Sequence, residues 1–325
     1  MPTPVRLVLL LLGVQLACAC RSTGDDAAFL ARCQAAAAYS REHGGEVMLV
    51  LREGTPVLRD AIDGFSTGTP HLLASGTKSF SGIAAALAVD DGLLRFDELV
   101  SDTITEWKSD PRKSKVTVRQ LLSLASGLES LGAKIDNPRN ARTAGITDRA
   151  KASIDARMLA DPGKRFIYGP SSYYVFGELM KRKLVAAKTG DADVVAYLTR
   201  KVFAPLGISP RFLRDEAGNA NLPGGCRVSA EEWATFGEMV RNRGMHGGTR
   251  IVGEATLAEL LKPHGPNPAY GLTWWILRDG AMAAGKGKQR LYVLPTQGLT
   301  VVRFGPLEGP RGYEDREFLR RLLGD

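Results

Sequence analysis

The order of strand-like and helix-like segments is the sequence feature that most constrains the fold. Two strands around a turn are predicted in residues 45–64, and strand signals return only in "YGLTWWILRDG", "QRLYVLPTQ" and "LTVVRFG" (270–305). The residues between are chiefly helical, and strands do not alternate with helices as a doubly wound parallel sheet requires. We therefore predict an α+β fold (an α/β sandwich), with an antiparallel sheet from both chain ends flanked by helices and a mostly helical region inserted.

The flanking helices have their own signals. An alanine-rich helix is predicted over 26–43, and an amphipathic helix is predicted at the end of the chain in "YEDREFLRRLLGD". A further helix over 229–244 begins with Ser229 and has Glu232 three residues later, which is a capping-box pattern. No internal repeat or linker divides the chain into independent halves.

Charge and metal-ligand patterns exclude several function classes. The chain of 325 residues has 43 Lys and Arg against 35 Asp and Glu, a formal charge of +8, but the basic residues are interspersed with acidic ones. This mixture is typical of a solvated surface, so we expect no nucleic-acid partner. The four histidines are scattered and no Cys/His spacing resembles a zinc site. We expect neither a metal nor a cofactor.

The first residues read as an export signal. Arg6 precedes an apolar run, and small residues follow at 17–19, so we predict a signal peptide over 1–19 and a single domain over 20–325. Within that domain we expect sheet regions at about 27–80 and 225–325 and a helical region at about 81–224. The protein is then periplasmic, attached to the cell envelope or secreted. Lipid anchoring at Cys18 or Cys20 is an equal alternative to simple export.

Two cysteines remain in the exported domain. Cys33 and Cys226 could form a disulfide, because oxidising compartments preserve such bonds. Two separate buried thiols are at least as consistent with the sequence. Spacing alone does not decide between them.

A serine and a lysine in "ASGTKS" are the first candidates for chemistry. Ser75 and Lys78 are three residues apart, so on a helix they lie on the same face. A serine at a helix N-terminus is placed where the dipole favours the oxyanion formed during nucleophilic attack. The apolar run after Lys78 indicates burial, which favours a neutral lysine that can act as a base. The alternative is a serine N-cap beside a solvated lysine.

"GFSTG" at 64–68 offers a competing nucleophile. It matches G-x-S-x-G, the nucleophile elbow of α/β-hydrolases, which requires a helix immediately after the serine. Thr69 and Pro70 follow instead, and the βα alternation of that fold is missing. We interpret Ser66 as part of a loop.

Two later elements complete a possible site. Tyr168, before a Gly-Pro turn and a helix, could place a phenol against Ser75 and Lys78, or could be an ordinary half-buried aromatic residue. The closely spaced Gly285 and Gly287 in "AAGKGKQRLYVLP" allow close backbone approach of a ligand. A backbone N–H from this edge could donate to an acyl oxyanion.

These three elements, in this order, resemble the serine β-lactamase-related family, which includes class C β-lactamases, penicillin-binding proteins and allied esterases and amide hydrolases. The resemblance covers about residues 30–305, including "VTVRQLLSLASGLES" and "PGKRFIYGPSSYYVFGEL". It implies that Ser75 forms an acyl-enzyme with a small-molecule ester or amide, and that Lys78 and Tyr168 carry the proton. It also implies an oxyanion hole formed by the N–H groups of Ser75 and, in the preferred register, Lys286.

Two departures from the family pattern affect substrate choice. The family's Tyr-x-Asn motif reads Tyr-Gly-Pro here, so Pro170 offers no side-chain amide. The family's Lys-Thr-Gly motif reads Ala283-Ala284-Gly285. Both changes weaken the expectation of β-lactam recognition and leave the Ser/Lys/Tyr chemistry intact. Trp275, beside Trp274, could line an acyl pocket or pack in the sheet. A non-catalytic or slowly turning-over binding protein on this fold is the alternative function; the sequence does not predict an oligomeric state.

Overall fold

The computed structural model describes residues 23–131, 146–308 and 312–324. Within them, six strands form one antiparallel sheet in the order β2-β1-β11-β10-β9-β8. From one edge to the other these are Thr55–Ala61 (β2), Val47–Arg52 (β1), Leu299–Phe304 (β11), Gln289–Leu294 (β10), Gly280–Gly285 (β9) and Trp275–Leu277 (β8). β1 pairs with β11, with Val47 opposite Phe304. The α+β prediction is confirmed, because the two chain ends meet at the centre of the sheet.

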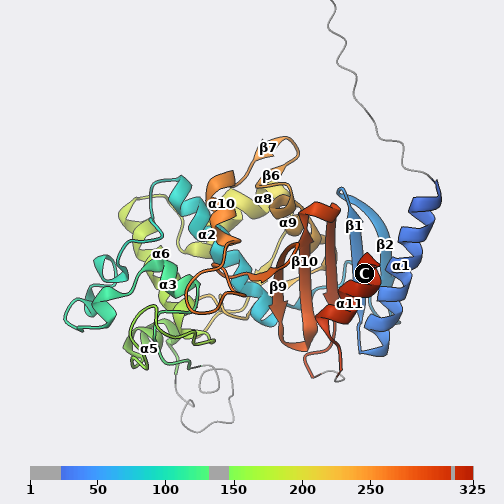
Figure 1. Ribbon diagram of the computed structural model, residues 1–325. Coiled ribbons are helices and arrows are strands. Elements are labelled where there is room, and N and C mark those ends of the chain that lie inside the picture. The colour runs from blue at the N-terminus through green and yellow to red at the C-terminus, as the bar shows by residue number, and fades with distance from the viewer. Residues whose placement is uncertain (1–22, 132–145, 309–311, 325) are drawn as a thin grey trace, which may run out of the picture.

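Alternation along the central strands produces two cores, one on each face of the sheet. Met48 and Val50 of β1 belong to the core beneath α1 (Thr23–Glu42) and α11 (Asp315–Leu323), whereas Leu49 belongs to the larger core on the opposite face. Successive side chains of a strand point to opposite faces, so a strand covered on both faces is apolar throughout. α9 (Ala230–Arg241) packs on the larger-core face against β1, β10 and β11. Figure 1 shows α1 and α11 side by side over the outer face.

The inserted helices form a second layer beside the edge of the sheet (Figure 1). α2 (Lys78–Asp90) passes between the two regions and is buried from Lys78 to Ala88. The surrounding helices are α3 (Val118–Leu122), α5 (Arg149–Asp155), α6 (Ser171–Ala186), α7 (Val194–Leu198), α8 (Ala204–Leu206) and α10 (Glu254–Leu260). α7 continues through a π-helical turn at Thr199–Phe203 into α8.

Two small sheets accompany the six-stranded sheet. β3 (His71–Leu72), β5 (Cys226–Val228) and β4 (Arg211–Phe212) form a three-stranded sheet in the order β3-β5-β4. β6 (Met245–His246) and β7 (Thr249–Arg250) form a hairpin. The three-stranded sheet was not predicted, because strands of two or three residues are too short to show a period. It fixes the residues that lead into Ser75.

The structure decides several of the open expectations. The Ser229–Glu232 capping box is confirmed, since both reciprocal hydrogen bonds are present. Cys33 in α1 and Cys226 in β5 are separate buried thiols. Ser66 lies in the loop after β2, where its Oγ bonds Thr69 Oγ1 at 3.1 Å, and no helix follows it directly. The predicted signal peptide over 1–19 and the lipidation candidates Cys18 and Cys20 lie outside the described residues.

No helix within the described ranges is both long and apolar enough to span a membrane.

Candidate active site

Ser75 lies in a tight 3-10 turn, η1 (Ala74–Thr77), between β3 and α2. Ala74 has φ of 46°, a left-handed conformation that is unfavourable for a residue with a Cβ. Thr77 stabilises this turn because its Oγ1 donates to the Ala74 carbonyl at 2.7 Å and accepts from the Cys226 N–H at 3.1 Å. Leu73 and Thr77 are the N-cap residues of η1 and α2, and neither makes a side-chain cap bond. Ser75 is therefore not a helix cap.

Lys78 is the first residue of α2 and is only 4% exposed. Its Nζ donates to Ser75 Oγ at 2.9 Å and to the Pro223 carbonyl at 2.6 Å. This burial excludes the alternative of a solvated lysine. The helical spacing places the amine beside the serine hydroxyl, which is the arrangement that a nucleophile and its base require.

Tyr168 approaches the same serine from the segment before α6. It hydrogen-bonds Ser75, and the Lys78 Nζ lies 5.0 Å from the centroid of its ring. Burial raises the pKa of Tyr168, and the hydrogen bond to Ser75 only partly offsets this rise, so the phenol keeps its proton at neutral pH. Trp275 stacks on the tyrosine ring, with centroids 6.1 Å apart and planes at 28°. Trp275 thus contacts Tyr168 and does not line the cavity above Ser75.

The segment between Tyr168 and α6 is shaped by a close contact. A Cβ at Gly169 would lie 1.8 Å from Ser130 Oγ, so only glycine fits there. Pro170 follows as the N-cap residue of α6 without a side-chain cap bond. The proline at this position is compatible with the helix start, since Pro has no N–H to satisfy.

The glycine-rich edge of β9 lies directly against the serine turn. A Cβ at Gly285 would lie 1.9 Å from the Leu73 carbonyl oxygen and 3.1 Å from the Gly76 nitrogen. Lys286 follows at the cavity wall, and its side chain forms an ion pair with Glu308. Gly287 has φ of 77° and turns the chain toward β10 without lining the cavity. Gly285 is thus the residue that permits the close backbone approach.

Ser75, Lys78, Tyr168 and Lys286 line one cavity of about 730 Å³. Several other residues also line this cavity that no sequence pattern indicated, including Ser130, Arg149, Asn221 and Leu307. The Pro-Gly-Gly run at 223–225 marks a turn, but nothing local indicates that the Pro223 carbonyl accepts from Lys78. In the part of the chain that the structure describes, no group of three or more His, Cys, Asp or Glu residues could hold a metal ion.

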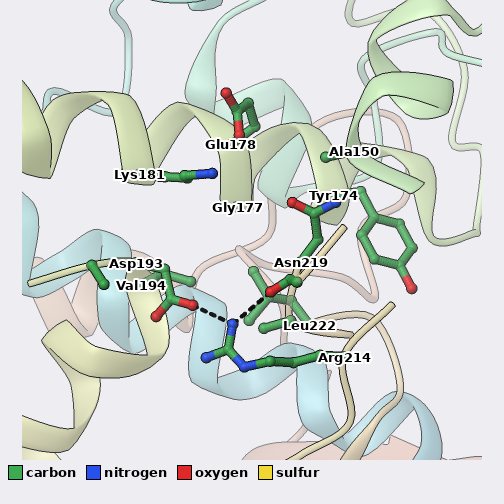
Figure 2. A pocket seen from close by; sticks show the side chains of 13 residues that line it. Ala150, Tyr174, Gly177, Glu178, Lys181, Asp193, Val194, Arg214, Asn219 and Leu222 are labelled. Carbon is green, nitrogen blue, oxygen red and sulfur yellow. Dashed lines mark hydrogen bonds and ion pairs between the residues drawn. The ribbon is translucent and has the colours of Figure 1, made fainter. Parts of the chain in front are cut away.

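A second cavity, of about 220 Å³, lies beside α6 (Figure 2). Arg214 borders both cavities, and its guanidinium is bonded to Asp193 Oδ2 at 2.5 Å and to the Gly218 carbonyl at 2.7 Å. No serine, threonine or cysteine is among the described residues that line this second cavity. Of these two cavities, the larger one is lined by both Ser75 and Lys78.

Comparison with known proteins agrees with this geometry. The family model described as "Beta-lactamase" matches residues 30–324, which is most of the chain. The chain belongs to the Beta-lactamase family. Its expected resemblance to serine β-lactamase-related proteins is confirmed.

Family relatives differ widely in the names they carry. The "Acyltransferase mokF" of Monascus pilosus is 29% identical over 193 residues, which cover 52% of this chain and 45% of that protein. The chain thus spans less than half the length of this curated relative. A penicillin-binding protein homologue from Caulobacter crescentus has a TM-score of 0.70 at 16% identity and covers 90% of this chain and 96% of its own. A D-stereospecific amidohydrolase from a Streptomyces species has a TM-score of 0.66 at 16% identity. The match covers 89% of this chain and 97% of the amidohydrolase.

The Beta-lactamase family, to which the chain belongs, includes hydrolases. The family includes esterases, acyltransferases and amidohydrolases, and an acyl-enzyme on serine is typical of it. Here the only buried lysine that donates to a serine hydroxyl within the described residues is Lys78. The site is thus able to deprotonate Ser75 and to hold the displaced proton on neighbouring groups.

Proposed function

We propose that this chain is an exported serine hydrolase that cleaves an ester or amide through an acyl-enzyme on Ser75. The observation that carries the proposal is the contact of 2.9 Å between Ser75 Oγ and the buried Lys78 Nζ, with the Tyr168 hydroxyl bonded to the same serine. A nucleophile in contact with two proton carriers is the arrangement that acyl transfer requires.

The reaction has two steps. In the first, Ser75 Oγ bonds to the substrate carbonyl carbon, its proton passes to the Lys78–Tyr168 pair, and that proton leaves with the alcohol or amine as the acyl bond breaks. In the second, a water molecule attacks the acyl-enzyme, and its proton returns to Ser75 through the same pair. The N–H groups of Ser75 and Lys286 stabilise the oxyanion in both steps.

The substrate is an ester or simple amide rather than a penicillin. Pro170 carries no side-chain amide, and Ala283 and Ala284 replace the lysine and threonine of the family motif, so polar anchors for a β-lactam are missing at these positions. Because the reacting groups are unaffected by these changes, ester hydrolysis should exceed nitrocefin hydrolysis.

Labelling with a fluorophosphonate tests the proposal. The purified protein is treated with the probe and the adduct is located by mass spectrometry, together with assays on p-nitrophenyl esters and nitrocefin. We expect an adduct on Ser75 that is lost in Ser75→Ala and strongly reduced in Lys78→Ala, while Ser66→Ala, in the exposed loop after β2, serves as the control. Failure of the wild-type protein to label or hydrolyse any of these substrates would support a non-catalytic binding protein instead.

Export is tested by mass spectrometry of the protein recovered from its native host. Cleavage after residue 19 gives a mature chain that begins at Cys20, and a diacylglycerol adduct on that cysteine identifies a lipoprotein. A recovered chain that retains Met1 and lies wholly in the cytoplasm contradicts this part of the proposal.

Acyl transfer to an alcohol is a second candidate. The relative from Monascus pilosus is named an acyltransferase, and a cavity of about 730 Å³ has room for an acceptor beside an acyl chain. Adding an alcohol to the ester assay tests this: ester product formed at the expense of free acid supports transfer, and unchanged acid release argues against it.

A further inference from the structure

Lys78 lies over the rings of two tyrosines. Its Nζ is 5.0 Å from the ring centroid of Tyr168 and 5.4 Å from that of Tyr173. An ammonium group within about 6 Å of an aromatic face is attracted by the negative charge density of that face, and more strongly where water is excluded. Lys78 is 4% exposed and Tyr173 is fully buried, so the contact with Tyr173 is shielded from solvent, whereas Tyr168 is 40% exposed.

Tyr173 is held in place by buried hydrogen bonds and lies away from the cavity above Ser75. It lies in the first turn of α6, and its hydroxyl donates to the Leu122 carbonyl at 3.2 Å and bonds Tyr270 Oη at 3.0 Å. It does not line the cavity above Ser75. Because both of its hydroxyl partners belong to the core, its ring cannot move away from Lys78 without breaking buried hydrogen bonds.

The two tyrosines are also connected to each other through Trp275 and Tyr270. Tyr168 stacks on Trp275, and Trp275 meets Tyr270 edge-on, with centroids 5.0 Å apart and planes at 78°. Tyr270 in turn bonds Tyr173. These contacts form a closed ring that runs through Lys78, Tyr168, Trp275, Tyr270 and Tyr173. Lys78 belongs to α2, Tyr173 to α6 and Trp275 to β8. Tyr168 lies in the segment before α6, and Tyr270 lies in the segment before β8.

We propose that Tyr173 is a positioning residue for the reaction: the face of its ring holds the Lys78 ammonium at Ser75 whenever the lysine carries the proton. The inference rests on the proposed function, since it concerns the lysine of that site. During acyl transfer the lysine alternates between amine and ammonium, while its Nζ has hydrogen-bond partners in Ser75 and Pro223. The ring face of Tyr173, in addition to that of Tyr168, supplies an attraction that acts on the charged form of Lys78.

Fluorination of the ring at position 173 separates this role from packing. Phenylalanine and its mono-, di- and trifluoro derivatives have nearly the same shape, but each fluorine withdraws charge from the ring face and weakens its attraction for a cation. The series is introduced at position 173 by non-natural amino-acid incorporation. Rates of fluorophosphonate labelling at Ser75, and kcat and KM for a p-nitrophenyl ester, are then measured on each folded variant.

We expect Tyr173→Phe to retain most of the labelling rate, and the trifluoro derivative to be about tenfold slower than Phe, which corresponds to the attraction of a buried cation–π contact. The loss should appear in kcat, with KM nearly constant, because Tyr173 does not line the substrate cavity. Tyr197 is the matched control: it is also fully buried among the helices, and Arg200 lies 5.7 Å from its ring centroid, remote from Ser75. The trifluoro derivative at 197 should label at the wild-type rate.

Folding is controlled in the same experiment. Loss of the Tyr173 hydroxyl leaves the Tyr270 hydroxyl without this partner, so the series is repeated in Tyr270→Phe, and circular dichroism establishes the folded fraction. A flat series, or a loss in Tyr173→Phe as large as in the trifluoro derivative, would overturn the inference while leaving the proposed function intact. A wild-type protein that neither labels nor hydrolyses esters overturns the proposed function and this inference with it.

Discussion

Replacing Gly285 with alanine should abolish most of the activity through a single backbone contact. The added Cβ would lie 1.9 Å from the Leu73 carbonyl oxygen, whereas Cβ atoms do not approach other heavy atoms closer than 3.0 Å. The end of β9 must therefore recede from η1 by about 1.1 Å, because neither partner is a flexible side chain. Gly285 has φ of −130° and ψ of 165°, which alanine adopts without strain, so the contact alone is responsible.

The expected magnitude follows from that displacement. A misplacement of about 1 Å in a reacting constellation costs about 10²-fold in rate, or about 2.7 kcal/mol of transition-state stabilisation. We expect this loss in kcat/KM for a p-nitrophenyl ester, and a similar loss in the rate of fluorophosphonate labelling. The Lys286 N–H is displaced with the strand, so the oxyanion is the species most affected.

Gly280 provides the matched control at the other end of β9. A Cβ there would lie 2.1 Å from the Val293 carbonyl oxygen, so Gly280→Ala creates a similar clash about 17 Å along the strand from Gly285. Both variants should lose comparable stability in urea unfolding, but only Gly285→Ala should lose 10²-fold in activity per folded molecule. Equal activity of the two variants would refute the assignment of the β9 edge to the active site.

Three further predictions concern the stability of the fold and the reactivity of its thiols. Thr77→Val removes bonds to the Ala74 carbonyl and from the Cys226 N–H, and should lower the free energy of unfolding by about 1–3 kcal/mol in urea titrations; an unchanged midpoint would contradict the role of Thr77. Burial would raise the pKa of Asp315, but its hydrogen bonds with Arg290 and that residue's charge outweigh burial and hold the pKa below its usual range. The stability this provides is present above the unfolded pKa of about 3.9 and is lost as pH falls through the folded pKa. Between about pH 6 and pH 3 the free energy of unfolding should therefore decrease less in Asp315→Asn than in the wild-type protein. Burial raises the pKa of Cys33 to about 11 and that of Cys226 further, so neither thiol should react with a thiol reagent at pH 8 until the protein unfolds.

The parts of the site that the sequence predicted are those that depend on local geometry. Ser75 and Lys78 are three residues apart at the start of a helix, and this spacing alone brings a hydroxyl and an amine to one face. Gly285 was identified because glycine is the residue that permits close backbone approach, and the contact with Leu73 has that form. Tyr168 required the resemblance to a family, since its distance along the chain gives no geometric constraint.

The remaining features depend on contacts between distant segments. The Pro223 carbonyl accepts from Lys78 across 145 residues, and every residue has a carbonyl, so no residue type could have indicated it. Tyr173 has the same sequence signal as any apolar residue on the buried face of a helix. The three-stranded sheet β3-β5-β4 joins His71 to Val228 through pairs too short for a period. Such contacts become visible only when the whole chain is folded.

Because β1 pairs with β11, the centre of the sheet joins residues near the two ends of the described domain. The sheet can therefore be completed only after its last strand has been synthesised. Val47 and Phe304 lie opposite each other, so closing this pair encloses almost the entire domain in one loop. Contacts of such long range are formed slowly, and none of them can form while the last strands are still inside the ribosome. The Ser75 turn is synthesised early, but the β9 edge that completes it arrives more than 200 residues later. The proposed site is therefore incomplete during most of synthesis, and Ser75 acquires its surroundings late in folding.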